Sequence, residues 1–176
     1  LRDHTPAELD RVNDERLARR GVAPYLRRSF AAQRWLSPTH RTVIASAISR
    51  LEGVADAGAI VAASLTAEDE PSAVVRAQQA MLLAHHHVQR EPLRAFDAIG
   101  GVVIGFTVSG RVVVYTAVDV VAWTEATDRI TRALLAVDGV ASAPSRDLYV
   151  TGLVTPAATA ALGRRGFATT SAYVPR

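Results

Sequence analysis

Three consecutive histidines, His85–His87, are the residues best suited by type to acid–base or metal chemistry. They fall in a predicted helix, where successive side chains point about 100° apart, so the rings cannot converge on one ion. Neither Met81 nor Gln89, each four residues from His85, is a conventional metal ligand. We interpret the histidines as a last helical turn that interacts with the helix dipole. The alternative is a site completed by His40 or a distant carboxylate.

All twenty basic residues are arginine, and the chain has no cysteine. The sequence therefore excludes a Schiff-base lysine, a phosphate-loop lysine, a lysine general base, a cysteine nucleophile and thiolate metal sites. A disulfide framework is excluded for the same reason. No Gly-x-Ser-x-Gly nucleophile motif is present, and Ser109 lies in a predicted turn. We therefore expect no catalytic residues that the sequence alone can identify.

Asp119 is the isolated carboxylate best placed for function, because it lies between a predicted strand and a predicted helix, near Trp123. A capping or turn-forming role is the alternative that we favour. Gly100, Gly101 and Gly105 enter and interrupt a predicted strand, whereas a dinucleotide fingerprint joins a strand to a helix. We therefore expect no bound cofactor and no bound metal.

The strongest electrostatic feature is a basic tract from Arg16 to Arg50, which holds eight arginines and no acidic residue. Arginine interleaved with aromatic residues suits a phosphate-rich surface or an acidic partner. The alternative is that Tyr25, Phe30 and Trp35 anchor the core while the arginines only face solvent. The predicted partner-binding residues are Arg16, Arg19, Arg20, Arg27, Arg28, Arg34, Tyr25 and Trp35.

Nucleic-acid binding through the basic tract is a weaker expectation. The helices predicted at 38–51, 57–64 and 72–88 follow one another as in a helix-turn-helix protein, but the acids Glu68-Asp69-Glu70 precede the third. Phosphate would repel a recognition helix in that position. We interpret these acids as a solvated helix start, because no calcium-ligand spacing follows them.

Capping signals predict that residues 1–92 form a helical arm and helix bundle. Thr5-Pro6-Ala7-Glu8 begins a helix over 6–20 with a thin apolar stripe, and Gly21 ends it. Ser37-Pro38 repeats the cap-and-proline signal before an amphipathic helix. The predicted helices of this half are 6–20, 25–35, 38–51, 57–64 and 72–88.

The hydrophobic period changes after Leu93. Two β-branched runs, 102–108 and 111–118, flank Ser109-Gly110 and predict a hairpin. A helix over 124–137, a strand over 148–154, a helix from Pro156 and a strand over 167–174 follow. The fold class is therefore α+β, with a helical N-terminal half and a small mixed sheet (β-β-α-β-α-β) with two helices over 93–176, sharing one core.

The 176 residues are 49% hydrophobic, which suits one domain or two small subdomains. No apolar run approaches the roughly 20 residues of a membrane-spanning helix. Abundant alanine beside arginine indicates a GC-rich bacterial genome. The chain begins at Leu1, so we expect that upstream sequence is missing and that the lack of a visible signal peptide does not limit localisation.

Four places in the sequence resemble a family of bacterial proteins of unknown function, several of them exported, from GC-rich genomes. They are Trp35-Leu36-Ser37-Pro38, Asp119 with Trp123-Thr124, Thr151-Gly152 with Thr155-Pro156, and Gly166-Phe167. The chain departs from the family at Phe167, where the relatives carry tryptophan. The resemblance implies no reaction, cofactor or catalytic residue, and it favours a periplasmic or other extracytoplasmic localisation.

We expect a non-enzymatic interaction or assembly subunit that is part of a larger assembly. Its Arg-rich N-terminal helical surface would dock onto an acidic protein surface or an anionic membrane face. One alternative is an enzyme or ligand binder whose site combines Asp119, His40 and one of His85–His87. The other is nonspecific nucleic-acid binding through the basic tract.

Overall fold

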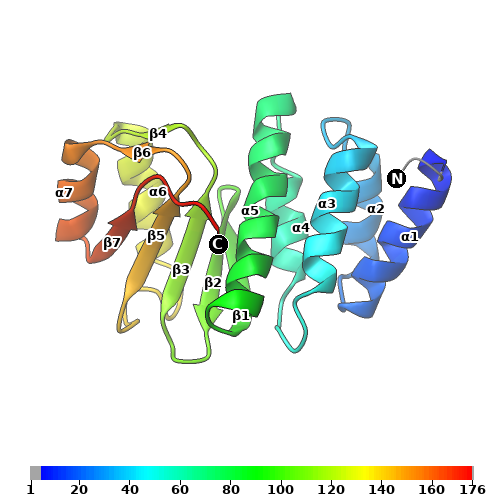
Figure 1. Ribbon diagram of the computed structural model, residues 1–176, viewed down its shortest axis with the longest axis horizontal. Coiled ribbons are helices and arrows are strands. Elements are labelled where there is room, and N and C mark those ends of the chain that lie inside the picture. The colour runs from blue at the N-terminus through cyan, green and yellow to red at the C-terminus, as the bar shows by residue number, and fades with distance from the viewer. Residues whose placement is uncertain (1–4, 176) are drawn as a thin grey trace.

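The N-terminal half of the chain is a row of helices that leads to a sheet (Figure 1). The computed structural model describes residues 5–175. The fifth helix lies between the sheet and the other four. These helices are α1 (Pro6–Arg19), α2 (Pro24–Ala32), α3 (Pro38–Ser49), α4 (Gly58–Ser64) and α5 (Glu70–Gln89).

Side-chain caps fix where the long helices begin. Thr5 and Glu8 form the predicted capping box of α1, and the Ser37 hydroxyl accepts a hydrogen bond from the backbone N–H of His40 at α3. Asp69 caps α5, so this helix begins two residues earlier than expected, inside the acidic turn. Hydrogen bonds from Ser72 lower the pKa of Asp69 below its ordinary value. Carboxylates at this end of a helix also suit its dipole.

The second half forms a five-stranded mixed sheet of order β1-β2-β3-β5-β7. The first three strands are antiparallel, and β3, β5 and β7 run parallel because α6 and α7 cross over between them. A two-stranded parallel sheet, β4-β6, lies at one end. The α+β fold class is confirmed. The elements are β1 (Leu93–Ile99), β2 (Val102–Thr107), β3 (Val112–Thr116), β4 (Val120–Val121), α6 (Glu125–Leu135), β5 (Arg146–Val150), β6 (Leu153–Val154), α7 (Pro156–Arg164) and β7 (Phe167–Thr170).

The edge strand β1 is absent from the predicted order β-β-α-β-α-β, as are the two-residue strands β4 and β6. Strand β1 has the sequence Leu-Arg-Ala-Phe-Asp-Ala-Ile, and its pairing with β2 shifts register near Leu93. Alanine and aspartate are poor strand formers, which hides the alternation. Gly100 and Gly101 form the turn between β1 and β2, with φ of 56° and 79°. They lead into β2, as predicted, and Gly105 lies within that strand; the preceding strand β1 was not predicted.

Two hydrophobic clusters lie on the two faces of the sheet. The larger joins α1–α5 to Phe96, Val113 and Tyr115, so it contains residues from both halves of the chain. The smaller lies between the other face and the helices α6 and α7, around Val114 and Phe167. Among the described helices, none has both the length and the apolar character that crossing a membrane requires.

Gly152 packs directly against the chain that leads into β4. Its N–H donates to the carbonyl of Val118 at 3.0 Å, and the N–H of Leu153 donates to that of Asp119 at 2.8 Å. A Cβ at Gly152 would overlap the backbone of Val118 and Asp119.

We expect Gly152→Ala to separate β4 from β6 and lower the free energy of unfolding by about 1–3 kcal/mol. Gly163→Ala is the matched control, because a Cβ at that helical position meets nothing within 4 Å. Removing a helical glycine should stabilise the protein by up to about 1 kcal/mol. Urea unfolding curves measure both values, and equal stability of Gly152→Ala and wild type would contradict the packing argument.

Candidate functional site

The fold brings acidic residues to the basic tract, although the tract itself contains none. Three of its arginines bridge neighbouring helices through a carboxylate, and each also donates to a backbone carbonyl. The bonds therefore stabilise the packing of α1 against α2 and α3. The ion pairs are Arg27 Nε–Asp14 Oδ1 (2.8 Å), Arg41 Nε–Asp10 Oδ1 (3.1 Å) and Arg20 Nη2–Glu52 Oε1 (3.0 Å).

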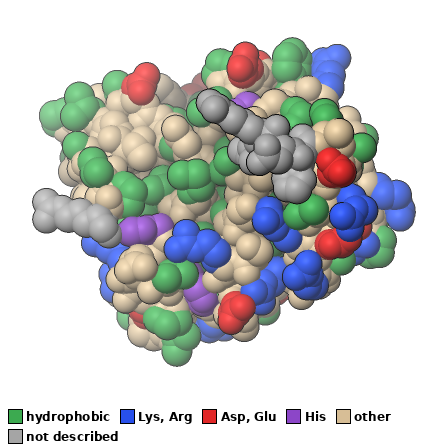
Figure 2. All heavy atoms as spheres, turned by 45° about the vertical axis from the view of Figure 1, so that its right-hand side comes forward, with side chains coloured by type: hydrophobic (Ala, Val, Ile, Leu, Met, Phe, Trp, Pro, Cys, Tyr) green, Lys and Arg blue, Asp and Glu red, His purple; other side chains and the backbone are tan. Residues whose placement is uncertain are grey.

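Of the other predicted residues, Arg19, Arg28, Arg34 and Tyr25 are exposed, whereas Trp35 is half-buried against the larger hydrophobic cluster. Arg19 lies 3.8 Å from Glu15, an exposed pair, and Arg28 makes no hydrogen bond or ion pair with any described residue. Arg34 stacks over the ring of Trp35 at 4.8 Å. Tyr25 is 62% exposed, so it does not anchor the core. Figure 2 shows the arginines concentrated over the N-terminal helices.

An apolar groove runs between α1, α3 and α5, with a volume of about 660 Å³. We refer to it as the α1–α3–α5 groove. Its floor is one face of α3, from Thr42 through Val43 and Ala47 to Arg50. Leu9, Val12 and Arg16 of α1 form one wall, and Met81, Leu82, Ala84 and His85 of α5 form the other. Met81 is 51% exposed, so the groove leaves a large apolar side chain in contact with water.

Among the described residues that line this groove, the charged side chains are Arg16 and Arg50, and none is acidic. Arg16 donates to the Ser46 hydroxyl at 3.0 Å, and neither arginine forms an ion pair with a described residue. The groove therefore combines apolar walls with two arginines that, unlike Arg20 and Arg27, have no carboxylate partner within residues 5–175.

The histidines of α5 point into three different environments, as the helical spacing predicts. His85 lines the groove, His86 is buried against the sheet, and His87 Nδ1 accepts a hydrogen bond from the N–H of Leu93 at 3.0 Å. Within residues 5–175, no group of His, Asp and Glu side chains is arranged to hold a metal ion.

The structure does not bring together Asp119, His40 and the histidines of α5. Asp119 precedes β4, on the far side of α5 from the helix α3 that carries His40 (Figure 1). The Asp119 side chain is exposed and has no hydrogen bond or ion pair with the described residues, while its carbonyl accepts the N–H of Leu153. Thr124, rather than Asp119, caps the helix α6.

A buried aromatic cluster surrounds His86, which is 2% exposed. Its Nδ1 lies 2.8 Å from the Tyr115 hydroxyl, and its Nε2 has no hydrogen-bond partner among the described residues. The ring of Tyr115 stacks on Tyr149 at 4.7 Å, and Arg90 lies over Tyr149 and Tyr173. Burial, helped by the charge of Arg90, lowers the pKa of His86 to about 4. Burial raises the pKa of Tyr115. Both groups are therefore neutral at pH 7.

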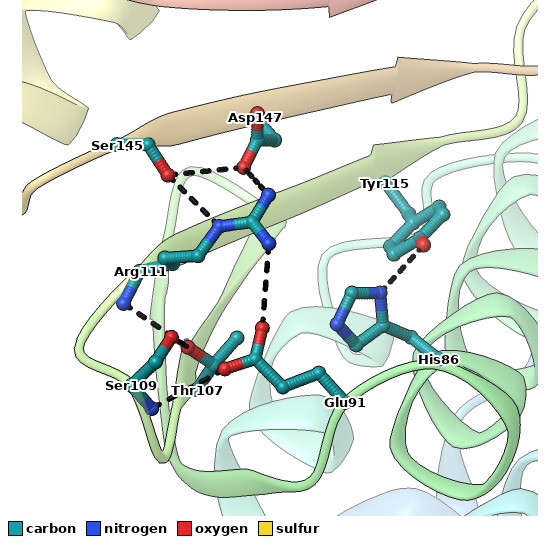
Figure 3. A network of polar contacts seen from close by, with 8 residues as sticks. All are labelled: His86, Glu91, Thr107, Ser109, Arg111, Tyr115, Ser145 and Asp147. Atoms are coloured by element: carbon teal, nitrogen blue, oxygen red, sulfur yellow. Dashed lines mark hydrogen bonds and ion pairs between the residues drawn. The ribbon is translucent and has the colours of Figure 1, made fainter.

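Arg111 forms the centre of a neighbouring polar network, shown in Figure 3. Its Nη2 lies 2.6 Å from Asp147 Oδ2, and its Nη1 lies 3.5 Å from Glu91 Oε2. Burial opposes the charge of Glu91, but hydrogen bonds from Ser109 and Thr107 and the charge of Arg111 hold its pKa below the ordinary value. The network ties the β2–β3 turn to β5 and to the end of α5. None of these side chains lines the α1–α3–α5 groove, so we assign the network a structural role.

Sequence reasoning missed both the groove and the aromatic cluster. Arg111, Asp147, Tyr115 and Tyr149 meet because β3 pairs with β5 in parallel, with Tyr115 opposite Tyr149. The two strands are about thirty residues apart in the chain, and no local pattern encodes their register. The sequence did hold one signal for an exposed apolar surface. Met81 and Val88 are seven residues apart, which places both on one face of α5, and both are exposed.

Comparison with known proteins gives no counterpart. A scan against protein-family models finds no match, and searches of curated proteins and of solved structures find no significant match. The resemblance drawn from four short motifs stays a prediction. Function therefore has to be inferred from the residues and their geometry.

The low pKa of His86 predicts a loss of stability on acidification. Because the folded-state pKa lies below the ordinary value of 6.5, the contribution of the neutral ring is fully present above about pH 6.5 and is lost as the pH falls toward 4. A shift of this size corresponds to roughly 3 kcal/mol. His86→Gln should flatten the dependence of the unfolding free energy on pH over this range.

Urea unfolding between pH 7.5 and 4, measured in steps of about half a unit, tests this expectation. His85→Gln is the matched control, because it removes a neighbouring histidine from the open groove instead of from the core. It should keep the wild-type slope. Parallel curves for wild type and His86→Gln would show that His86 does not carry the effect.

Proposed function

We propose that the protein is a non-enzymatic interaction subunit, whose α1–α3–α5 groove binds an acidic amphipathic helix of a partner protein. The observation that carries this proposal is the combination of an apolar concave surface with two arginines, Arg16 and Arg50, that have no carboxylate partner among the described residues. A partner of this chemistry would satisfy both features at once.

The shape of the groove supports a helical occupant. Helix α3 forms the floor, and α1 and α5 form the walls, so a further helix laid along α3 would contact all three. The floor from Thr42 to Arg50 is about 12 Å long, which is a little over two helical turns. Apolar residues of the partner at helical spacing would cover Val43 and Met81 and exclude water from them.

Charge complementarity defines the occupant further. Arg20, Arg27 and Arg41 already bind carboxylates of this chain, whereas Arg16 and Arg50 bind none in the part of the chain that the structure describes. Aspartate or glutamate beside the apolar stripe of the partner would pair with the latter two in a partly desolvated setting, where charge contributes to specificity. A flat membrane surface fits this concave site less well than a protein segment.

The exposed arginines outside the groove have a different role in this proposal. Arg19, Arg28 and Arg34 would raise the local positive potential and speed the encounter with an acidic partner, an effect that weakens with salt. The dispersed enzyme site has less support, because Asp119, His40 and the histidines of α5 lie on separate elements. Nucleic-acid binding has less support, because the concave site is apolar.

A selection from displayed helical peptides tests the proposal. The library fixes apolar residues at helical spacing and leaves the remaining positions random. Wild-type protein should enrich peptides rich in aspartate and glutamate, and the Arg16→Glu/Arg50→Glu double variant should enrich lysine and arginine instead. The best acidic peptide should bind the double variant at least about tenfold more weakly, which is 1.4 kcal/mol, because its carboxylates would face like charge.

Arg28→Glu/Arg34→Glu is the matched control, with the same change in net charge outside the groove. It should slow association at low salt and leave the selected sequences acidic. No enrichment on wild type, or equal affinity for both double variants, would contradict the proposal. Binding to phosphatidylglycerol vesicles that depends on Arg28 and Arg34 but not on Arg16 and Arg50 would assign the function to a membrane surface instead.

A further inference from the structure

A second cavity of about 400 Å³ lies between helix α6 and the sheet, on the face opposite α5. We refer to it as the α6 pocket. Val114 and Leu148 of the sheet form its base, and Ile130 and Leu134 of α6 form one wall. Phe167 of β7 contributes another wall, and the segment around β4 borders the remaining side.

The pocket exists because α6 does not pack closely on the sheet. Ile130 and Leu134 share the apolar face of this helix, but only Thr131 and Leu134 are buried. Ile130 remains 39% exposed although it faces the sheet side of the helix. A helix that filled the space would bury this side chain, so the cavity leaves apolar surface uncovered.

None of the described residues that line the pocket has an ionisable side chain, so the polar atoms there are backbone groups and threonine hydroxyls. Three of the four threonine hydroxyls are already used. Thr124 accepts a hydrogen bond from the N–H of Thr127 at 3.2 Å, Thr127 donates to the carbonyl of Ala122 at 2.8 Å, and Thr131 donates to that of Thr127 at 2.7 Å. The Thr116 hydroxyl, at the end of β3, makes no hydrogen bond with any described residue. It is therefore available to a molecule in the pocket.

The pocket also opens where parallel sheets commonly bind ligands. Thr116 is the last residue of β3, which pairs in parallel with β5, and Val118 lies just beyond this carboxyl end. Crevices outside the carboxyl ends of parallel strands are the usual ligand sites of α/β units, because the connections to the crossover helices leave space there. The β3–α6–β5 unit has this arrangement.

From this geometry we infer that the α6 pocket binds a small, uncharged, apolar molecule with one hydrogen-bonding group directed at Thr116. Its volume lies at the lower end of the roughly 300–1,000 Å³ typical of small-molecule sites. A protein helix, about 10 Å across, would not fit within it. A charged ligand would lose its hydration without gaining an ionic partner, which is costly in an apolar site.

Titration with N-phenyl-1-naphthylamine, an uncharged probe that fluoresces in apolar surroundings, tests the inference. Wild type should bind it saturably with one site. Val114→Phe and Ile130→Trp each fill the pocket from a different wall, and each should weaken binding by at least about tenfold. Val108→Phe is the matched control, because Val108 is exposed in the β2–β3 turn and does not line the pocket.

The α1–α3–α5 groove is also apolar, so a second control separates the two cavities. Met81→Glu places a charge in the groove and should leave probe binding unchanged. Thermal unfolding of each variant shows whether it is folded. If Val114→Phe is unstable, Ile130→Trp still tests the pocket, because Ile130 is half-exposed and tolerates a larger side chain more easily. Lack of saturable binding to wild type, or undiminished binding to a folded pocket-filling variant, would overturn the inference.

Competition against the bound probe tests the chemical class of ligand. 1-Decanol should displace the probe, and decanoate should do so at least about tenfold less well, since its carboxylate finds no cation. Thr116→Val should weaken decanol severalfold, because the isosteric side chain lacks the hydroxyl. Equal displacement by the alcohol and the carboxylate would overturn the assignment of an uncharged ligand.

Discussion

The packing of α5 against β3 determines how the two halves of the molecule fit together. The amide of Gln79 donates to the carbonyl of Tyr115 at 2.7 Å, and His86 bonds to the hydroxyl of the same tyrosine. Tyr115 is fully buried, and both its carbonyl and its hydroxyl bond to side chains of α5. Because a buried polar group is costly without a partner, these bonds fix the rotation of α5 on the sheet.

That rotation determines which residues of α5 are left exposed. Gln79 and His86 point at the sheet, and Ala80 and Leu83 lie in the larger hydrophobic cluster. Met81 and His85 therefore lie on the remaining side of α5, where they line the groove. Helix α3 packs against both α1 and α5, and the α1–α3–α5 groove lies over α3 between these two helices. The groove thus follows from the same polar contacts that join the sheet to the helices.

Local signals in the sequence predicted most of the fold and little of the candidate site. Helix caps at Thr5, Ser37 and Thr124 act over three or four residues, so they can be read directly from the chain. Arg27 finds Asp14 only because α2 packs on α1, and an acid-free stretch of sequence therefore did not mean an acid-free surface. The groove requires the positions of three helices, which depend on tertiary packing instead of local preference.

The two apolar cavities call for different ligands because charge is placed differently around them. In the groove, Arg16 and Arg50 lie among apolar side chains at a surface open to water, where a carboxylate from outside can reach them as its hydration is lost. No described residue supplies such a cation to the lining of the α6 pocket, and the hydroxyls of Thr127 and Thr131 already donate to backbone carbonyls. A charge that is favourable in the first cavity is therefore unfavourable in the second, although both have walls of aliphatic side chains. Placement of a few polar atoms, more than hydrophobicity, separates a surface for an acidic partner from a site for a neutral molecule.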